Sequence, residues 1–264
     1  MRLTALSLAL LTVVSLPAGA QQRQSGDTFN WSGKIPSGRW IRVRNLNGRI
    51  TVGQAPGDQV QVTATKHWRR GDPADVHFQV TKFGPNDESV LICALWFDNS
   101  TCDEDGYDAH GGGRHHNNDV NVEFHVLVPK GVKVGVWTVN GGAFVDGATD
   151  EVQAHTVNGD VEANSSGGPV SATTVNGSVR ASMGKLDDKD LEFTTVNGGV
   201  TVELPADASA DVELSTLNGS LHTDYELTVR GRMEPRHLSA HIGKPGGPRI
   251  RLRTVNGSID LRQR

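Results

Sequence analysis

Several features common in enzymes and membrane proteins are scarce in this sequence of 264 residues. Only two cysteines and 5% aromatic residues are present, and no stretch shows the 3.6-residue apolar period of an amphipathic helix. After residue 16, no apolar run approaches the roughly 20 residues that a membrane-spanning helix needs. The formal net charge of -4 leaves no basic surplus. The composition therefore argues against a helical protein and against general nucleic-acid binding.

Motifs of the common catalytic classes are missing as well. The sequence has no Gly-x-Ser-x-Gly elbow for a serine nucleophile, no glycine-rich loop ending in Gly-Lys-Ser/Thr, and no His-Glu-x-x-His zinc motif. We therefore expect neither a cofactor nor an enzyme with one of these mechanisms.

The first 20 residues have the features of a secretory signal peptide. Arg2 precedes the apolar stretch Leu3–Leu16, and residues 17–20 end in a small-x-small cleavage pattern. Cleavage would leave about 244 residues beginning at Gln21, with no transmembrane segment. The sequence thus predicts an exported protein of the periplasm, the cell envelope or the extracellular space.

The two cysteines, Cys93 and Cys102, are close enough in sequence to join the two ends of one loop. An oxidising compartment after export would favour a disulfide between them, worth roughly 2 to 3 kcal/mol in the chain-entropy model. A pair of free thiols is the alternative, because two cysteines are too few for a structural zinc site.

Residues 21–130 are expected to form irregular β-strands. Period-2 alternation of apolar and polar residues occurs at 40–44, 60–65 and 120–126, which indicates strands with one buried face. Four of the five tryptophans lie in this half and the fifth, Trp137, follows it. The core beyond this point is therefore expected to consist of smaller side chains.

Residues 131–264 are dominated by an Asn-Gly repeat that continues from the earlier pair at Asn47. From Asn140 onward, successive Asn-Gly pairs are 18, 18, 21, 21 and 38 residues apart, and the last step suggests two units, one of them a degraded copy. A period near 20 is typical of a solenoid, whose units bury their apolar faces against their neighbours. The corner residues are Asn140, Gly141, Asn158, Gly159, Asn176, Gly177, Asn197, Gly198, Asn218, Gly219, Asn256 and Gly257.

Three further columns accompany the Asn-Gly pair. Threonine stands two residues before nearly every asparagine, a valine or leucine one residue before, and an apolar residue three after. In a two-residue hairpin, Val175 and Val179 would point to opposite faces, so we expect a corner between successive strands of a coil instead. Stacked coils would align threonines and asparagines, with like side chains bonding along each column. A right-handed coil follows from the usual preference of parallel crossovers.

These features resemble the bacterial putative-adhesin domain family of unknown function, whose members carry β-strand repeats. The resemblance covers roughly residues 29–261 and rests on the exported start, the copy at 46–50, the Pro-Lys-Gly bridge within 126–132 and the serial Thr-Val-Asn-Gly units. It implies a fold and brings no catalytic residues.

One polar window is a candidate metal site. Carboxylates and imidazoles could hold zinc, copper or calcium, although their spacing fits no standard motif, and a flexible surface loop is the alternative. The candidate ligands are Asp105, Asp108, His110, His115 and His116.

The sequence thus predicts an all-β protein, a right-handed β-solenoid of about 18–21-residue coils with an irregular β-rich N-terminal half or cap. The expected role is non-enzymatic, as an adhesin-like or envelope scaffold surface whose partner is an unidentified glycan or protein. A carbohydrate-active or metal-dependent enzyme on the same scaffold is the alternative. Its candidate residues on a coil face would be Asp160, Glu162, Arg180, Glu203 and Asp260.

Overall fold

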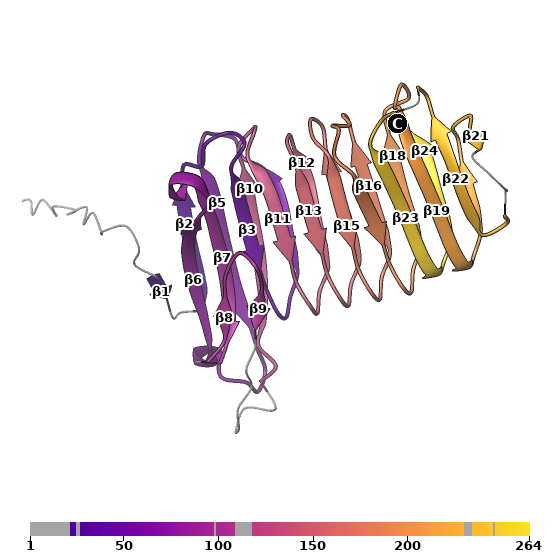
Figure 1. Ribbon diagram of the computed structural model, residues 1–264. Coiled ribbons are helices and arrows are strands. Elements are labelled where there is room, and N and C mark those ends of the chain that lie inside the picture. Colours follow the sequence, from indigo (N-terminus) through magenta and orange to yellow (C-terminus); the bar gives the residue numbers. More distant parts are fainter. Residues whose placement is uncertain (1–21, 25–26, 98, 109–117, 230–233, 245) are drawn as a thin grey trace, which may run out of the picture.

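The computed structural model shows an elongated stack of β-strands in two facing sheets (Figure 1). The predicted signal peptide at residues 1–20 lies outside the described residues, so its cleavage stays a prediction. No helix in the described part of the chain is long and apolar enough to cross a membrane. The structure describes residues 22–24, 27–97, 99–108, 118–229, 234–244 and 246–264.

The first sheet, sheet A, contains 12 strands. Its central strands pair in parallel, whereas strands near both ends pair antiparallel. In spatial order the strands are β1 (Gln22–Gln24), β6 (Val76–Phe83), β7 (Ser89–Trp96), β3 (Trp40–Arg44), β11 (Lys133–Trp137), β13 (Val152–His155), β15 (Val170–Thr173), β17 (Leu191–Thr194), β23 (Arg249–Asn256), β19 (Ala210–Asn218), β22 (His237–Ile242) and β21 (Thr228–Val229).

The second sheet, sheet B, contains 10 strands and faces sheet A across the core. Its spatial order is β2 (Thr28–Gly33), β5 (Val60–His67), β10 (Asn121–Val128), β4 (Ile50–Gln54), β12 (Ala143–Ala148), β14 (Val161–Ser165), β16 (Val179–Met183), β18 (Val200–Leu204), β24 (Ile259–Gln263) and β20 (Leu221–Thr223). A small third sheet and two 3-10 turns complete the described elements: β8 (Thr101–Cys102), β9 (Tyr107–Asp108), η1 (Pro73–Asp75) and η2 (Pro85–Asp87).

Each coil contributes one strand to each sheet, with an Asn-Gly corner between the two strands. In β13 and β14, for example, Val152, Ala154, Val161 and Ala163 are buried, and the residues between them face outward. Neighbouring coils repeat this alternation in register, so valines stack on valines and alanines on alanines. The expected β-solenoid is therefore confirmed. Its core consists mainly of valines and alanines over these coils, but Met183 and, in the next coil, Phe193 are also fully buried, so the expectation of small side chains holds only in part. The handedness stays a prediction.

The asparagine side chains form one continuous ladder along the corner edge of the stack. Each Nδ2 donates to the Oδ1 of the asparagine in the adjacent coil, at 2.8 to 2.9 Å. Such amide ladders need identical residues at one height in every coil, which explains why the asparagine recurs. The spatial order of the ladder is Asn47, Asn140, Asn158, Asn176, Asn197, Asn256 and Asn218.

The threonine column is ordered differently from our expectation. The threonines are buried, but they do not bond to one another; each hydroxyl donates to the carbonyl of a corner glycine in the adjacent coil, as Thr195 does to Gly177 at 2.8 Å. Asn45, which replaces threonine in the first copy, has no earlier corner glycine to reach. Its amide donates to the carbonyl of Val122 at 2.8 Å. The column thus satisfies buried backbone carbonyls.

The apolar column directly before the asparagines is half-buried to exposed and does not point into the core, so the inward direction that we expected for it was wrong. Val175 is 39% exposed and Leu217 is 60% exposed, because the chain turns at this residue and the inward place already belongs to threonine. Thr174 and Val179 are the buried pair, the arrangement that a hairpin would also give. The coil corner was correctly predicted, but the parity of the valines was the wrong reason.

The 38-residue step near the C-terminus does not contain a degraded copy. The coil of Asn256 lies between the coils of Asn197 and Asn218, so β23 pairs with both β17 and β19, and β24 with both β18 and β20. The chain therefore passes over one position in the stack, turns back through β22 and fills that position last. Figure 1 shows these strands together at the yellow end.

The N-terminal end of the stack has a larger core. Phe29, Phe78 and Phe124 are fully buried, with the first two rings stacked at 4.7 Å and the last two edge to face at 6.0 Å. Among the tryptophans only Trp96 is fully buried, whereas Trp68 is 40% exposed. The three phenylalanines and Trp96 therefore widen this end, where antiparallel strands replace the coils.

Replacing Val200 with Asp tests the inward column. Val200 is fully buried in β18, and an unpaired charge there should lower the free energy of unfolding by about 3 to 5 kcal/mol. Thr201→Asp, one residue along and outward, should change it by less than about 1 kcal/mol. Urea denaturation followed by tryptophan fluorescence measures both, and equal losses would contradict the alternation.

Replacing Gly177 with Ala tests the close approach of the coils. A Cβ at this position would lie 2.0 Å from the carbonyl oxygen of Gly159, so the coils must separate at a cost of about 1 to 3 kcal/mol. Gly57→Ala is the control, because a Cβ there meets no atom within 4 Å. Thermal unfolding of the two variants should differ clearly, and a wild-type melting temperature for Gly177→Ala would reject the contact.

Candidate functional site

The solenoid presents two outer faces on which outward side chains stand in straight rows. One row of sheet A crosses seven adjacent strands, and the parallel register fixes its members side by side: Arg44, Trp137, His155, Thr173, Thr194, Arg253 and Ser215. Strands in a sheet are spaced about 4.8 Å apart. Any functional group on this face is therefore held at a fixed interval by the coils beneath it.

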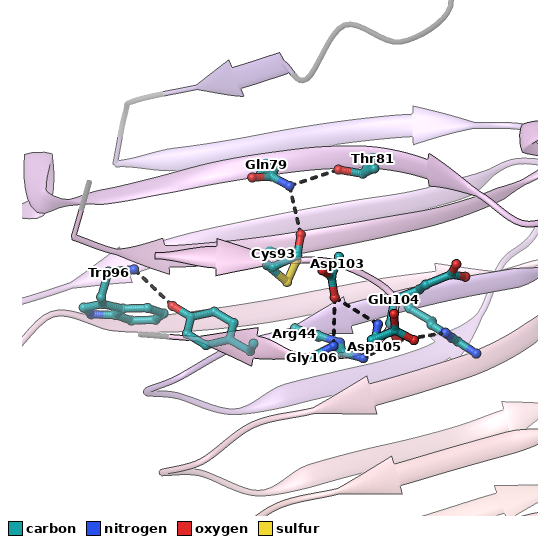
Figure 2. The surroundings of a disulfide bond; sticks show 12 residues. Arg44, Gln79, Thr81, Cys93, Trp96, Asp103, Glu104, Asp105 and Gly106 are labelled. Carbon is teal, nitrogen blue, oxygen red and sulfur yellow. Dashed lines mark hydrogen bonds between the residues drawn. A yellow bond between two sulfur atoms is a disulfide. The ribbon is translucent and has the colours of Figure 1, made fainter. Parts of the chain in front are cut away.

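The disulfide holds a short hairpin over the N-terminal part of this face. Strand β7 is buried on both sides because its outward residues Leu91, Cys93 and Leu95 form a second small apolar cluster. Cys93 and Cys102 are bonded, and Tyr107 packs against this cluster. We call residues 99–108, which include β8 and β9, the disulfide hairpin (Figure 2).

The hairpin reaches past β7 to β3 and β11. The Tyr107 hydroxyl accepts a hydrogen bond from the backbone N–H of Trp96 at 3.1 Å, and its ring stacks on that of Trp137 at 5.8 Å. Burial raises the pKa of Tyr107 to about 12. This phenol therefore stays protonated and serves as a packing group at physiological pH.

The turn of the hairpin aims one backbone carbonyl at two arginines. The carboxylate of Asp103 accepts hydrogen bonds from the N–H groups of Asp105 and Gly106, at 3.0 and 2.9 Å, which fixes the turn. The Glu104 carbonyl then accepts from Arg44 Nη2 at 2.7 Å and from Arg42 Nη1 at 3.5 Å (Figure 2). Two outward side chains of β3 thus converge on one neutral oxygen.

A groove of about 190 Å³ lies between these arginines and the next two strands. Gly135 stands at its centre, where an outward side chain of β11 would otherwise project; a Cβ there would lie 3.0 Å from Arg42 Cγ. Glycine within a strand often marks a close approach of another group. The side chains that surround Gly135 in the lining include Arg42, Arg44, Trp137, Gln153 and His155.

Burial and charge shift two titratable groups in the groove. Desolvation, and then the neighbouring charge of Arg42, lower the pKa of Arg44, while Asp103 and Asp105 raise it. Burial, followed by the charge of Arg44, lowers the pKa of His155, whose Nδ1 is hydrogen-bonded to Thr173 Oγ1 at 2.5 Å. The imidazole is therefore held neutral near pH 7 beside a charged guanidinium.

The candidate metal ligands are only partly within the described structure. His110, His115 and His116 lie outside the described residues. Asp105 is in the turn of the disulfide hairpin and Asp108 is in β9. In the part of the chain that the structure describes, no group of three or more histidine, cysteine, aspartate or glutamate side chains could hold a metal ion. The metal hypothesis therefore stays untested.

The five residues considered for an enzyme, four carboxylates and Arg180, lie on or beside the outer face of sheet B. Glu162, Arg180 and Glu203 line one open groove of about 320 Å³. Asp160 is at a corner, where it accepts from the N–H of Ser178, and Asp260 lies near Arg262 and His222. The structure thus brings three of the five together.

The sheet A groove was not predicted from the sequence. The alternation of Trp40, Arg42 and Arg44 with buried residues already placed these three on one face, and Gly135 interrupts a strand of valines. Both signals were present. Their meeting depends on the parallel pairing of β3 with β11 and on the hairpin above them, neither of which the sequence displays.

Replacing His155 with Gln tests its suppressed protonation. A lowered folded pKa means that the unfolded chain binds the proton more readily, so wild-type stability is complete above the unfolded pKa of about 6.5 and falls as pH drops through it. The loss should not exceed about 1.4 kcal/mol per pH unit for one group. Urea unfolding of both proteins from pH 8 to pH 5 should show a shallower decline for His155→Gln; parallel curves would refute the shift.

The chain was compared with known protein sequences and structures. No curated protein sequence matches the chain. A putative cell adhesion protein from Clostridium sporogenes ATCC 15579 shares 9% identity over 90% of this chain and 100% of its own, with a TM-score of 0.46. A putative adhesin from Bacteroides fragilis NCTC 9343 shares 13% over 90% and 97%, with a TM-score of 0.25. At these identities and TM-scores, the two structures do not indicate a function for this chain.

The family comparison is more specific. Its model covers nearly all of the coils that the Asn-Gly columns predicted, from Trp137 in β11 to Arg262 in β24. The resemblance stated from the sequence is confirmed over residues 137–262, which match the model of the Toastrack family, DUF4097; the model does not cover residues 29–136.

Proposed function

We propose that this protein is an exported, non-enzymatic, adhesin-like protein that presents its outer strand faces to an extended partner of the cell envelope, a glycan or a protein. The observation that carries the proposal is the unbroken asparagine ladder, which runs through all seven Asn-Gly corners. A stack locked in this way presents outward residues as rigid rows, and rigid, repetitive surfaces suit extended partners.

The outer face of sheet A supports a binding role more than the outer face of sheet B does. Its row combines an aromatic ring, an imidazole, guanidinium groups and hydroxyls, from Trp137 and His155 to Thr173 and Thr194. Trp137 is half-buried against the disulfide hairpin, so its position is fixed before any partner arrives. Preorganised side chains lose less conformational entropy on binding.

Export is the part of the proposal that rests on the N-terminal sequence. The apolar stretch Leu3–Leu16 and the cleavage pattern before Gln21 support it. The disulfide between Cys93 and Cys102 agrees with an oxidising compartment.

A pair of outward tryptophan substitutions tests the proposed function. Thr194→Trp obstructs the row on sheet A, and Thr201→Trp obstructs sheet B at a comparable, half-buried position. We expect saturable binding of the exported protein to cell-envelope fractions, weakened at least about tenfold by the sheet A variant, which corresponds to about 1.4 kcal/mol. The sheet B variant should bind like wild type.

Surface-immobilised protein and fractionated envelope material allow the affinities to be compared, with melting temperatures as the folding control. An absence of saturable binding by the wild-type protein would overturn the adhesin-like role. Wild-type binding by both variants would exclude the outer faces as the contact surface.

A further inference from the structure

The unusual feature of the sheet A groove is a pair of positive charges that share a neutral acceptor. Arg42 and Arg44 both donate to the Glu104 carbonyl, and within the described residues neither guanidinium forms an ion pair with a carboxylate. The carboxylates of Asp103 and Asp105 act on the Arg44 guanidinium through their charge and not through a hydrogen bond. Like charges brought together in this way repel each other, and a bound anion would relieve that repulsion.

The aromatic rings around the arginines fix their positions further. The Arg42 guanidinium lies over the rings of Trp40 and Phe83, 5.2 and 4.9 Å from the ring centroids. Arg44 is held by its 2.7 Å bond to the hairpin carbonyl. Each guanidinium has five N–H donors in a planar fork, so most donors remain for a ligand after these contacts are made.

The size of the groove limits what can enter it. A volume of about 190 Å³ is below the roughly 300 to 1,000 Å³ of sites that enclose a whole drug-sized ligand. Gly135 lines the groove and lets the side chain of Arg42 pack closely over β11, because a Cβ there would lie 3.0 Å from Arg42 Cγ. A small oxyanion fits this space if the rest of its molecule lies along the open face.

The neighbouring row indicates what that remainder is. Beyond His155, the outward groups on the next two strands are the hydroxyls of Ser171, Thr173 and Thr194 and the carboxylate of Glu192. This carboxylate accepts a hydrogen bond from Thr194 Oγ1 at 3.2 Å and lies beside Arg251 of the next strand. The hydroxyls of Thr173 and Thr194 continue the row of His155 as uncharged hydrogen-bonding groups, and Gln153 adds an amide beside the groove. Such a surface complements the hydroxyl groups of a sugar chain better than the apolar side chains of a peptide.

We propose that the groove around Gly135 binds an oxyanion, a carboxylate or a phosphate, carried by an acidic glycan whose neighbouring sugars lie over the outer face of sheet A. Arg42 and Arg44 are the anion-binding residues, because guanidinium forks match the geometry of both groups. The disulfide hairpin positions them through Glu104. The proposal rests on the adhesin-like function and names the ligand class of that face.

Calorimetric titration of the whole exported protein with three defined probes tests the proposal. The probes are a galacturonic acid trimer for the carboxylate, a phosphorylated mannose trimer for the phosphate, and uncharged maltotriose. We expect one of the two acidic probes to bind with a 1:1 stoichiometry, with an affinity that falls as salt is added. Maltotriose should bind at least tenfold more weakly.

Three variants locate the binding. Arg44→Gln should weaken binding of the acidic probe at least tenfold. Gly135→Val should do the same without changing charge, because its side chain would displace that of Arg42. Arg180→Gln is the matched control, since it removes an outward arginine of sheet B and should bind like wild type. Melting curves check the folding of Gly135→Val, and Arg44→Gln tests the site should that variant fail to fold.

The proposal is overturned if neither acidic probe binds, if maltotriose binds equally well, or if Arg44→Gln binds like wild type. Binding to cell-envelope material distinguishes a failure of the anion site from a failure of the adhesin-like function. If Arg44→Gln retains full envelope binding that Thr194→Trp loses, the adhesin-like role stands and the anion site falls.

Discussion

The register of the asparagine ladder is the constraint on which the rest of the structure depends. Each side-chain amide must lie within 2.8 to 2.9 Å of the next, so every coil is fixed in height at its corner. Coils of 18 and 21 residues can then stack only if the extra residues leave the corner edge. They do so at the opposite edge, where longer turns around residues 184–190 and 205–209 lie outside the strands. Because the corner is invariant, the strands on both sides stay in register.

The two ends of the stack require a different solution. An unfinished parallel sheet exposes unpaired N–H and C=O groups that can recruit another chain. At the N-terminal end, each sheet ends in an antiparallel pair, β6 with β1 and β5 with β2, and the edge strands are short, with 3 residues in β1 and 6 in β2. At the C-terminal end, β22 and β21 do so for sheet A, while the last coil is placed inside the stack instead of at its end. The chain terminus is thereby paired on both sides.

The sequence predicted the repeating part of this fold well because its restraints are local and recur. Each Thr-Val-Asn-Gly unit determines its corner conformation locally. The column three residues after the asparagines is buried as predicted, whereas Val175, directly before Asn176, points outward and was predicted to point inward. What it could not reveal is the order of units with equal corners. Either Asn218 or Asn256 could follow Asn197 in the ladder, because both corners carry the same Asn-Gly pair. In the structure Asn256 follows Asn197 and Asn218 follows Asn256, and the chain reaches this order by turning back through β22. The arginine groove escaped prediction for the same reason, since its parts come from β3, β11, β13 and the disulfide hairpin.

The groove lies where the regular coils meet the N-terminal end, and this position has a physical basis. Inside the stack each coil has the same neighbours, and the open groove of about 320 Å³ on sheet B is formed by outward side chains of successive coils alone. At the first coils, the chain between β4 and β11 is free to leave the stack and return over its outer face. A disulfide then holds this excursion against β7, and its turn reaches Arg42 and Arg44. A repetitive scaffold thus acquires a groove covered by a non-repetitive segment at the point where its repetition begins, and the coils that follow extend this surface along one face.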